Sequence, residues 1–288
     1  MKALPFKIPK VENSSFHLQT DKEPYFYDKL HQHPELQLVW IERGEGTLIF
    51  GDFLGEFHSG ELYLIGSDVP HVFRSKAEYY LPGTPGILAR TIFFKPELVF
   101  KGSSVLPELG QLKDLVNWAE RGLRIESGKA EGIIRMMLEV FESDSLTRLG
   151  KIICLLGELK KTDHQTLSQL PMKSINEHQG RRLDDVFKFT MENYNRPITL
   201  DEVAEVVHMN KAAFCRYFKQ HTRKTFLNFL NEIRLQKASE LLRNSEFSVA
   251  QIAFDVGFNN LSNFNRTFKL YKGTTPHELR SDFRVDLQ

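Results

Sequence analysis

The chain has 288 residues, of which 41% are hydrophobic, and 38 Lys and Arg nearly balance 37 Asp and Glu for a net charge of +1, as in a soluble globular protein of about two domains. No apolar run reaches the ~18 residues that a membrane span needs, and the start lacks the apolar region of a secretory signal, so we expect a cytoplasmic protein. Cys154 and Cys215 form no Cys-x-x-Cys pair, which excludes a zinc finger or a disulfide scaffold and predicts buried free thiols.

Short β-rich runs broken by turn residues fill residues 35–94. The runs at 36–41, 47–50 and 61–65 each end at a glycine or a glycine pair. Turns at intervals of ~8 to 12 residues favour a β-sandwich or a small barrel. We assign residues 1–110 to this β-rich domain.

After Pro107 the apolar period becomes helical. Three apolar stripes with helical spacing follow one another in residues 111–160. The third stripe suits packing against the barrel or against the same helix of a second copy of the chain, so residues 111–160 are predicted to be a helical dimerisation region. Residues 161–182 are polar with little periodicity, which predicts a linker to the last domain, residues 183–288. The stripes are Leu112, Leu115, Val116 and Ala119; Ile133, Ile134, Met137 and Val140; and Leu146, Leu149, Ile152, Ile153, Leu156 and Leu159.

The C-terminal part is mildly basic. Residues 181–288 carry 17 Lys and Arg against 13 Asp and Glu, whereas residues 1–180 carry 21 against 24. A basic module is compatible with a polyanionic partner, although ordinary scatter in surface charge gives the same difference.

This basic part contains a repeat. Ile198–Ala204 recurs as Phe247–Ala253, and the Arg-x-Phe-Lys sequence at Arg216 recurs at Arg266. The pattern of each copy predicts a short helix, a turn and a second helix, which together form a helix-turn-helix unit. The second helix of such a unit fits the major groove of DNA. The alternative is a helical bundle with an internal duplication.

An amphipathic stretch, residues 226–243, lies between the two copies. As a helix it would span roughly 27 Å, because each residue adds 1.5 Å. A spacer of this length can hold two reading helices in successive major grooves, ~34 Å apart.

A long motif follows in the second copy: Ile252-Ala253-x3-Gly257-Phe258-x5-Phe264-x-Arg266-x-Phe268-Lys269-x3-Gly273-x-Thr275-Pro276-x3-Arg280. It resembles the C-terminal signature of AraC/XylS-type transcription regulators, and the resemblance extends from Leu183 to Arg280. It implies a homodimeric bacterial transcription regulator that binds two adjacent half-sites of double-stranded DNA; it permits an activator, with RNA polymerase as a further partner, or a repressor. Arg223, His208 and Asn265 depart from the pattern, and no base preference is carried over.

The outward faces of the two second helices are the predicted DNA-reading surfaces. Arg216 and Arg266 suit a guanine edge or a phosphate, and Asn263 suits adenine. DNA contacts are predicted for Lys211, Ala212, Cys215, Arg216, Asn260, Leu261, Ser262, Asn263 and Arg266. Phosphate contacts, or plain solvated charges, are predicted for Lys219, Lys224, Lys269 and Lys272.

The β-rich domain carries a histidine motif. His31-x-His33-x3-Gln37-x6-Gly44 matches the spacing of the first cupin motif, with Gln37 in place of glutamate, and Gly60-x10-His71 matches the second. This resemblance implies a cupin-like barrel. His31, His33, Gln37 and His71 would together suit a divalent metal, but an amide is a weaker ligand than a carboxylate.

Three uses of the barrel stay open: an effector pocket, a metal site, or histidines with a purely structural role. In AraC-type regulators the barrel usually holds a small-molecule effector, and a sugar is one candidate for this chain. The residues predicted to contact the effector are His31, His33, Gln37, Trp40 and His71. Trp40, Phe50, Tyr63 and Phe73 suit stacking on a sugar or a barrel core.

The predicted fold class is α+β multidomain: a cupin-like β-barrel plus helices, then an all-α domain with two helix-turn-helix units joined by a long helix. No nucleophile motif or phosphate-binding glycine loop is found, so we predict a transcription regulator without a cofactor. The alternative is a metal-dependent cupin enzyme or a metal sensor.

Overall fold

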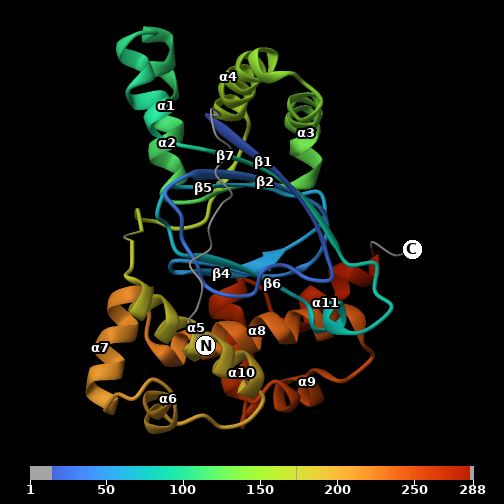
Figure 1. The fold of residues 1–288 in the computed structure, drawn as a ribbon. Helices are drawn as coiled ribbons and strands as arrows, with labels where there is room; N and C mark the ends of the chain where they lie inside the picture. Colours follow the sequence, from blue (N-terminus) through green and yellow to red (C-terminus); the bar gives the residue numbers. More distant parts are fainter. Residues whose placement is uncertain (1–14, 173, 286–288) are drawn as a thin grey trace. The chain divides into compact units, whose positions relative to one another are not determined.

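The computed structural model describes residues 15–172 and 174–285, which divide into two compact units, Met1–Gly180 and Arg181–Gln288 (Figure 1). Each unit is described by itself. None of the helices within the described ranges combines the length and the apolar character that crossing a bilayer requires.

The first unit contains two antiparallel sheets. The larger has the strand order β1-β7-β2-β5-β8-β9, and the smaller has the order β4-β3-β6. The strands are β1 (Phe16–Glu23), β2 (Leu36–Arg43), β3 (Gly46–Phe50), β4 (Phe53–Phe57), β5 (Leu62–Ile65), β6 (His71–Ser75), β7 (Ile87–Phe94), β8 (Leu123–Ile125) and β9 (Gln165–Thr166).

No ladder of the described strands joins the two sheets, so the expectation of a closed cupin-like barrel is corrected to an open pair of sheets. The central strands explain this, because β2 already pairs with β7 and β5, and β5 pairs with β2 and β8. Their backbone groups are used within the larger sheet. Among the described residues, only an isolated bridge between His31 and His71 links the segment before β2 to the smaller sheet.

Alternation along the strands divides the core of the first unit into two layers. In β2, Leu36 and Leu38 pack with the helices, whereas Val39 and Ile41 pack between the sheets. Figure 1 shows α3 and α4 on one face of the larger sheet and the smaller sheet on the other. The helices are α1 (Glu97–Phe100), α2 (Lys113–Ala119), α3 (Ser127–Phe141) and α4 (Ser145–Lys161), with 3-10 turns at Ala77–Tyr80, Gly102–Ser104 and Pro107–Leu112.

The segment predicted as a linker, residues 161–182, contains regular structure. Its β9 pairs with β8, Leu167 N donates to Gly122 O at 2.9 Å, and Ser168 is buried. The helix α5 begins at Glu177, before the predicted end of the linker. A two-residue strand is too short for any apolar alternation, so the sequence pattern gave no sign of it.

Both cysteines are exposed, so the prediction of buried thiols is wrong. Cys154 lies between the buried Ile152 and Leu155 on α4, and Cys215 lies beside the buried Phe214 on α7. Each thiol therefore lies on the side of its helix that turns away from the core.

The second unit is entirely helical over its described residues. Its helices are α5 (Glu177–Asn193), α6 (Leu200–Val206), α7 (Lys211–Thr222), α8 (Phe226–Asn244), α9 (Val249–Asp255), α10 (Leu261–Lys272) and α11 (Pro276–Val285). The predicted N-caps are confirmed for α6 and α9, where the side chains of Thr199 and Ser248 accept hydrogen bonds from Glu202 N and Gln251 N.

A charged network on the first unit gives a pH-dependent stability. His58 lies between two carboxylates, with Nε2 3.3 Å from Glu56 Oε2 and Nδ1 3.6 Å from Glu61 Oε1. Hydrogen bonds to Glu56 and to Glu61, opposed by burial, raise the pKa of His58 to about 9. The folded state therefore holds this proton more tightly than the unfolded chain does.

We expect the His58 charge to stabilise the first unit fully below pH 6.5, the ordinary pKa of histidine, and to lose its contribution as pH rises to about 9. Urea unfolding followed by tryptophan fluorescence measures this, because Trp40 and Trp118 both lie in this unit. His58→Gln should remove the pH-dependent difference, and His178→Gln, at an exposed position, should keep it. A difference between wild type and His58→Gln that is constant over this pH range would contradict the expectation.

Candidate functional sites

The helix pairs α6–α7 and α9–α10 share one turn geometry. In the first pair His208 has a φ of 54°, and Met209 N donates to Ala204 O at 2.9 Å. In the second pair Gly257 has a φ of 94°, and Phe258 N donates to Ala253 O at 2.9 Å. The two turns therefore match in backbone hydrogen bonding although only the second has a glycine.

The second helix of each pair begins and ends in the same way. Asn210 caps α7 by accepting from Ala213 N, and Asn260 caps α10 by accepting from Asn263 N. Both helices end at a left-handed residue, Arg223 with a φ of 59° and Gly273 with a φ of 75°. The two helices are equivalent elements of a repeated unit.

Buried phenylalanines fix which side of each second helix faces outward. Phe214 and Phe218 on α7, and Phe264 and Phe268 on α10, are fully buried. All nine residues predicted to contact DNA are exposed: Lys211, Ala212, Cys215, Arg216, Asn260, Leu261, Ser262, Asn263 and Arg266. This exposure makes two surfaces available for a partner.

Several of these exposed side chains already have partners. Arg266 Nη2 donates to Asn263 Oδ1 at 3.1 Å, which holds the two side chains together on α10. Lys211 Nζ lies 3.2 Å from Asp201 Oδ2 on α6. The side chain of Asn260 serves as the N-cap, so its amide oxygen is directed at the helix backbone.

The four predicted phosphate contacts differ in their surroundings. Lys219, Lys269 and Lys272 are exposed. Lys224 is half-buried, and its Nζ lies 2.6 Å from Glu232 Oε2 on α8. A phosphate contact by Lys224 would have to replace this ion pair.

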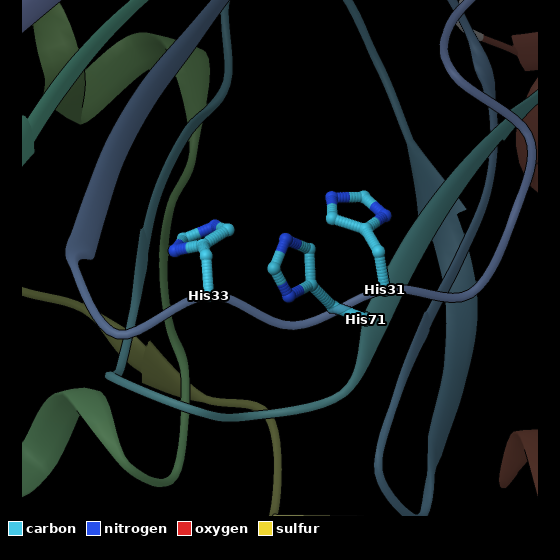
Figure 2. A group of neighbouring side chains, drawn as sticks. All are labelled: His31, His33 and His71. Carbon is cyan, nitrogen blue, oxygen red and sulfur yellow. The ribbon is translucent and has the colours of Figure 1, made fainter. Parts of the chain in front are cut away.

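In the first unit, His31, His33 and His71 lie side by side and project into the same space, with His71 between the other two (Figure 2). His31 and His33 lie on the segment before β2, and His71 begins β6. The backbones of His31 and His71 exchange two hydrogen bonds, at 3.1 and 2.9 Å. One ring nitrogen from each histidine lies within 4.8 Å of the other two.

Backbone carbonyls hold all three rings. The Nδ1 atoms lie 2.8 Å from Lys29 O for His31, 2.9 Å from Glu35 O for His33 and 2.8 Å from Val69 O for His71. Gln37 Oε1 lies 3.1 Å from His33 Nε2 and 3.0 Å from His71 Nε2. The spacing of the sequence motif therefore does bring these four side chains together.

The cluster is uncharged at neutral pH. Burial lowers the pKa of His31 to about 4, and burial also lowers the pKa of His33 and, most strongly, that of His71. Each neutral imidazole keeps one ring nitrogen with a lone pair, which is the form that binds a metal ion.

A cavity of about 110 Å³ adjoins the cluster. His31 and Gln37 line it, but Trp40 does not, because Trp40 lies on the other face of β2 against the helical layer. Phe50 and Tyr63 are buried between the sheets, which favours the barrel-core interpretation for them. The cavity lining also contains Gln19, Asp21, Glu23, Tyr25, Phe26, Tyr27, Val39, Phe73, Ile87, Thr91 and Phe93.

Most residues of this lining were not predicted from the sequence. Thr91 and Phe93 lie on β7 opposite Val39 and Gln37 of β2, and alternation places them on the same face as Gln37. That alternation was the available signal, but the pairing of β2 with β7, two strands far apart along the chain, was not visible in the sequence.

Comparisons with known proteins place the chain among regulators. A family model described as a helix-turn-helix domain matches residues 203–282. The uncharacterized HTH-type transcriptional regulator YdeC of Bacillus subtilis is 26% identical over 259 residues, which cover 87% of this chain and 85% of YdeC. The HTH-type transcriptional activator RhaS of Enterobacter sp. is 23% identical over 265 residues, which cover 90% of this chain and 89% of RhaS.

Solved structures also match the chain. A transcriptional regulator from Chromobacterium violaceum, described as containing an AraC-type DNA-binding domain, is 26% identical with a TM-score of 0.35 and covers 38% of this chain and 96% of its own.

Proposed function

We propose that the chain acts as a member of the AraC/XylS family of DNA-binding transcription regulators. In this role, α7 and α10 read two adjacent half-sites in the major groove of DNA. The full-length relatives are regulators, so the prediction of a regulator is confirmed in preference to a cupin enzyme. Activation of transcription, with RNA polymerase as a partner, is part of the proposal.

The repeated helix-turn-helix geometry is the observation that supports two reading helices. The caps, the turns and the buried phenylalanines of α6–α7 recur in α9–α10, so the second unit presents two equivalent exposed faces. Between the pairs, α8 has 19 residues, about 28 Å of helix. That length is close to the ~34 Å between successive major grooves on one side of B-form DNA.

Selection of random DNA duplexes with the full-length chain tests this function. We expect one enriched sequence with two half-sites about one helical turn apart, and an affinity that falls steeply as salt rises because Lys and Arg displace counterions from phosphates. Recovery of duplexes without any shared sequence would contradict the proposal.

The cavity of the first unit is the proposed effector site. It combines carboxylates, amides and hydroxyls with aromatic rings, which suits a small hydroxylated molecule such as a sugar. Burial raises the pKa of the Asp21 carboxyl against an opposing hydrogen bond from Gln19, whose Nε2 donates to Asp21 Oδ1 at 2.6 Å. A sugar bound here should change the affinity for the selected duplex, and a panel of sugars that leaves it unchanged would contradict this step.

We also propose that α4 forms the homodimer interface. Its outward side carries Leu146, which is 79% exposed, followed by Gly150, Cys154 and Gly157. Leu156, by contrast, is buried in the core of its own unit, so it is not available to a partner. Small residues along one helix face allow a second helix to approach closely.

A pair of glycine substitutions tests the dimer. A Cβ added at Gly150 or Gly157 meets no atom within 4 Å, so Gly150→Arg with Gly157→Arg should leave the fold intact and yield monomers by analytical ultracentrifugation. Gly132→Arg on α3, also in open space, is the matched control and should stay dimeric. A wild-type chain that sediments as a monomer, or a double variant that stays a dimer, would remove this interface.

A further inference from the structure

We infer that the cavity of the first unit selects small organic ammonium ions over neutral molecules of the same shape, with the Asp21 carboxylate as their counter-ion. This inference rests on the proposed effector site and narrows the chemical class of the effector. Three features of the cavity support it: the charge of its lining, its aromatic rings and the size of the space that it encloses.

The lining carries negative charge and no positive charge. Asp21 and Glu23 line the cavity, and the described residues around it include neither Lys nor Arg. His31 supplies no compensating charge at neutral pH, because burial lowers its pKa to about 4. A bound cation would therefore meet two carboxylates and no charge of its own sign in the wall.

Strand alternation explains this separation of charge. Asp21 and Glu23 lie two residues apart on β1 and both line the cavity, so Lys22 between them lies on the opposite face of the strand. Arg90 on the neighbouring strand β7 is engaged by a different carboxylate, with its Nε 3.1 Å from Glu42 Oε2. The basic residues closest along the two strands are therefore kept out of the lining.

The Asp21 carboxylate is the group that a cation would satisfy. Its Oδ1 accepts a hydrogen bond at 2.6 Å from Nε2 of the neutral Gln19, and it forms no ion pair with any described residue. Burial raises the pKa of Asp21 against this hydrogen bond, and the charge of Glu23 adds to the rise. The charged form is therefore penalised by its surroundings, and a positive charge beside it would offset that penalty.

Aromatic rings form much of the remaining wall. The face of an aromatic ring attracts a cation, and recognition sites for quaternary ammonium ions are built from such rings. Tyr25 is held in place by a stack on Tyr80, with the ring centroids 4.4 Å apart. The aromatic residues of the lining are Tyr25, Phe26, Tyr27, Phe73 and Phe93.

The enclosed space fits a compact head group. A cavity of about 150 Å³ holds benzene, so the cavity of about 110 Å³ admits roughly five heavy atoms, the size of a trimethylammonium head with its first methylene. Tyr25 and Tyr27, each 41% exposed, lie at the rim. The rest of a ligand, including a hydroxyl, can extend past them toward solvent.

Titration calorimetry of the full-length chain with choline and with neohexyl alcohol, its uncharged carbon analogue, tests the inference. The two molecules share one shape and one hydroxyl, and they differ in whether the branched head is a cation. We expect choline to bind at least about 10-fold more tightly, because the alcohol gains neither the ion pair nor the cation–π contact. Choline, but not the alcohol, should also change the affinity for the selected duplex.

Three variants locate the selectivity. Asp21→Asn should weaken choline binding by about 10-fold and leave the binding of the alcohol unchanged, because only the charge is removed. Glu23→Gln, at an exposed position on the rim, should weaken it by only about 2- to 5-fold, since solvent screens this charge. Asp114→Asn, exposed on α2 and outside the lining, is the matched control and should bind choline as the wild type does.

Circular dichroism checks the fold of each variant, and the choline-to-alcohol ratio of the wild type tests the inference even if Asp21→Asn fails to fold. No binding of choline, equal affinities for choline and the alcohol, or tighter binding of a neutral sugar would overturn the inference. A chain that binds the selected duplex without preferring choline rejects the ammonium class and leaves the proposed regulator standing. A chain that prefers choline but selects no DNA sequence does the reverse.

Discussion

Replacing Arg216 and Arg266 together by alanine should abolish sequence-selective DNA binding while leaving the fold intact. Both guanidinium groups are on exposed faces, one on each proposed reading helix, so their removal creates no cavity. A bidentate contact with a base contributes about 1–3 kcal/mol, so the double variant should lose about 2–6 kcal/mol, on the order of 30- to 10⁴-fold in affinity for the selected duplex.

The two arginines should not contribute alike. Arg266 is held by Asn263, at 3.1 Å between Nη2 and Oδ1, and a side chain that is already oriented loses less entropy on binding. Arg266→Ala alone should therefore cost more selectivity than Arg216→Ala alone. Fluorescence anisotropy with the selected duplex and with a scrambled duplex gives both affinities.

A charge-matched control separates base reading from general attraction. Lys188 on α5 and Arg243 on α8 are exposed and lie outside α7 and α10. Lys188→Ala with Arg243→Ala removes two positive charges as well, but should weaken binding to both duplexes equally and by less. If the control and the Arg216/Arg266 double variant behave alike, α7 and α10 are not the reading helices.

The sequence predicted the second unit well because its signals are local. Capping residues such as Thr199 and Ser248, the turn glycine Gly257 and the spacing of Phe264 and Phe268 all act within about one helical turn of each other. The duplication then repeated each signal, so a chance match in one copy could be checked against the other.

The first unit was less predictable because its features depend on pairing between distant strands. The structure has an open pair of sheets where a barrel was expected. This arrangement follows from the pairing of both edges of β2 and of β5 with other strands of the larger sheet. Trp40 was assigned to the pocket from its residue type, but the alternation of β2 directs it to the helical layer while Gln37 faces the cavity. The motif did predict that His31, His33 and His71 lie together, because it fixes their spacing in the sequence.

Replacing Gly257 by alanine should strongly destabilise the second unit, and it is the most damaging single substitution that we expect there. A Cβ at this position would lie 2.5 Å from Tyr194 O and 2.9 Å from Arg234 Nε, and the φ of 94° is itself unfavourable for alanine. Neither neighbour can move easily, because Arg234 Nε donates to Tyr194 O at 2.7 Å and Arg234 Nη2 donates to Arg196 O at 2.8 Å.

Gly273→Ala separates the two causes of this damage. Gly273 also has a positive φ, 75°, but a Cβ there would meet no atom within 4 Å, so only the backbone conformation is penalised, by about 1–2 kcal/mol. Gly257→Ala adds overpacking of about 1–3 kcal/mol to that penalty. Urea unfolding followed by far-ultraviolet circular dichroism reports the helical unit, and equal losses in the two variants would show that contact with Tyr194 and Arg234 contributes nothing.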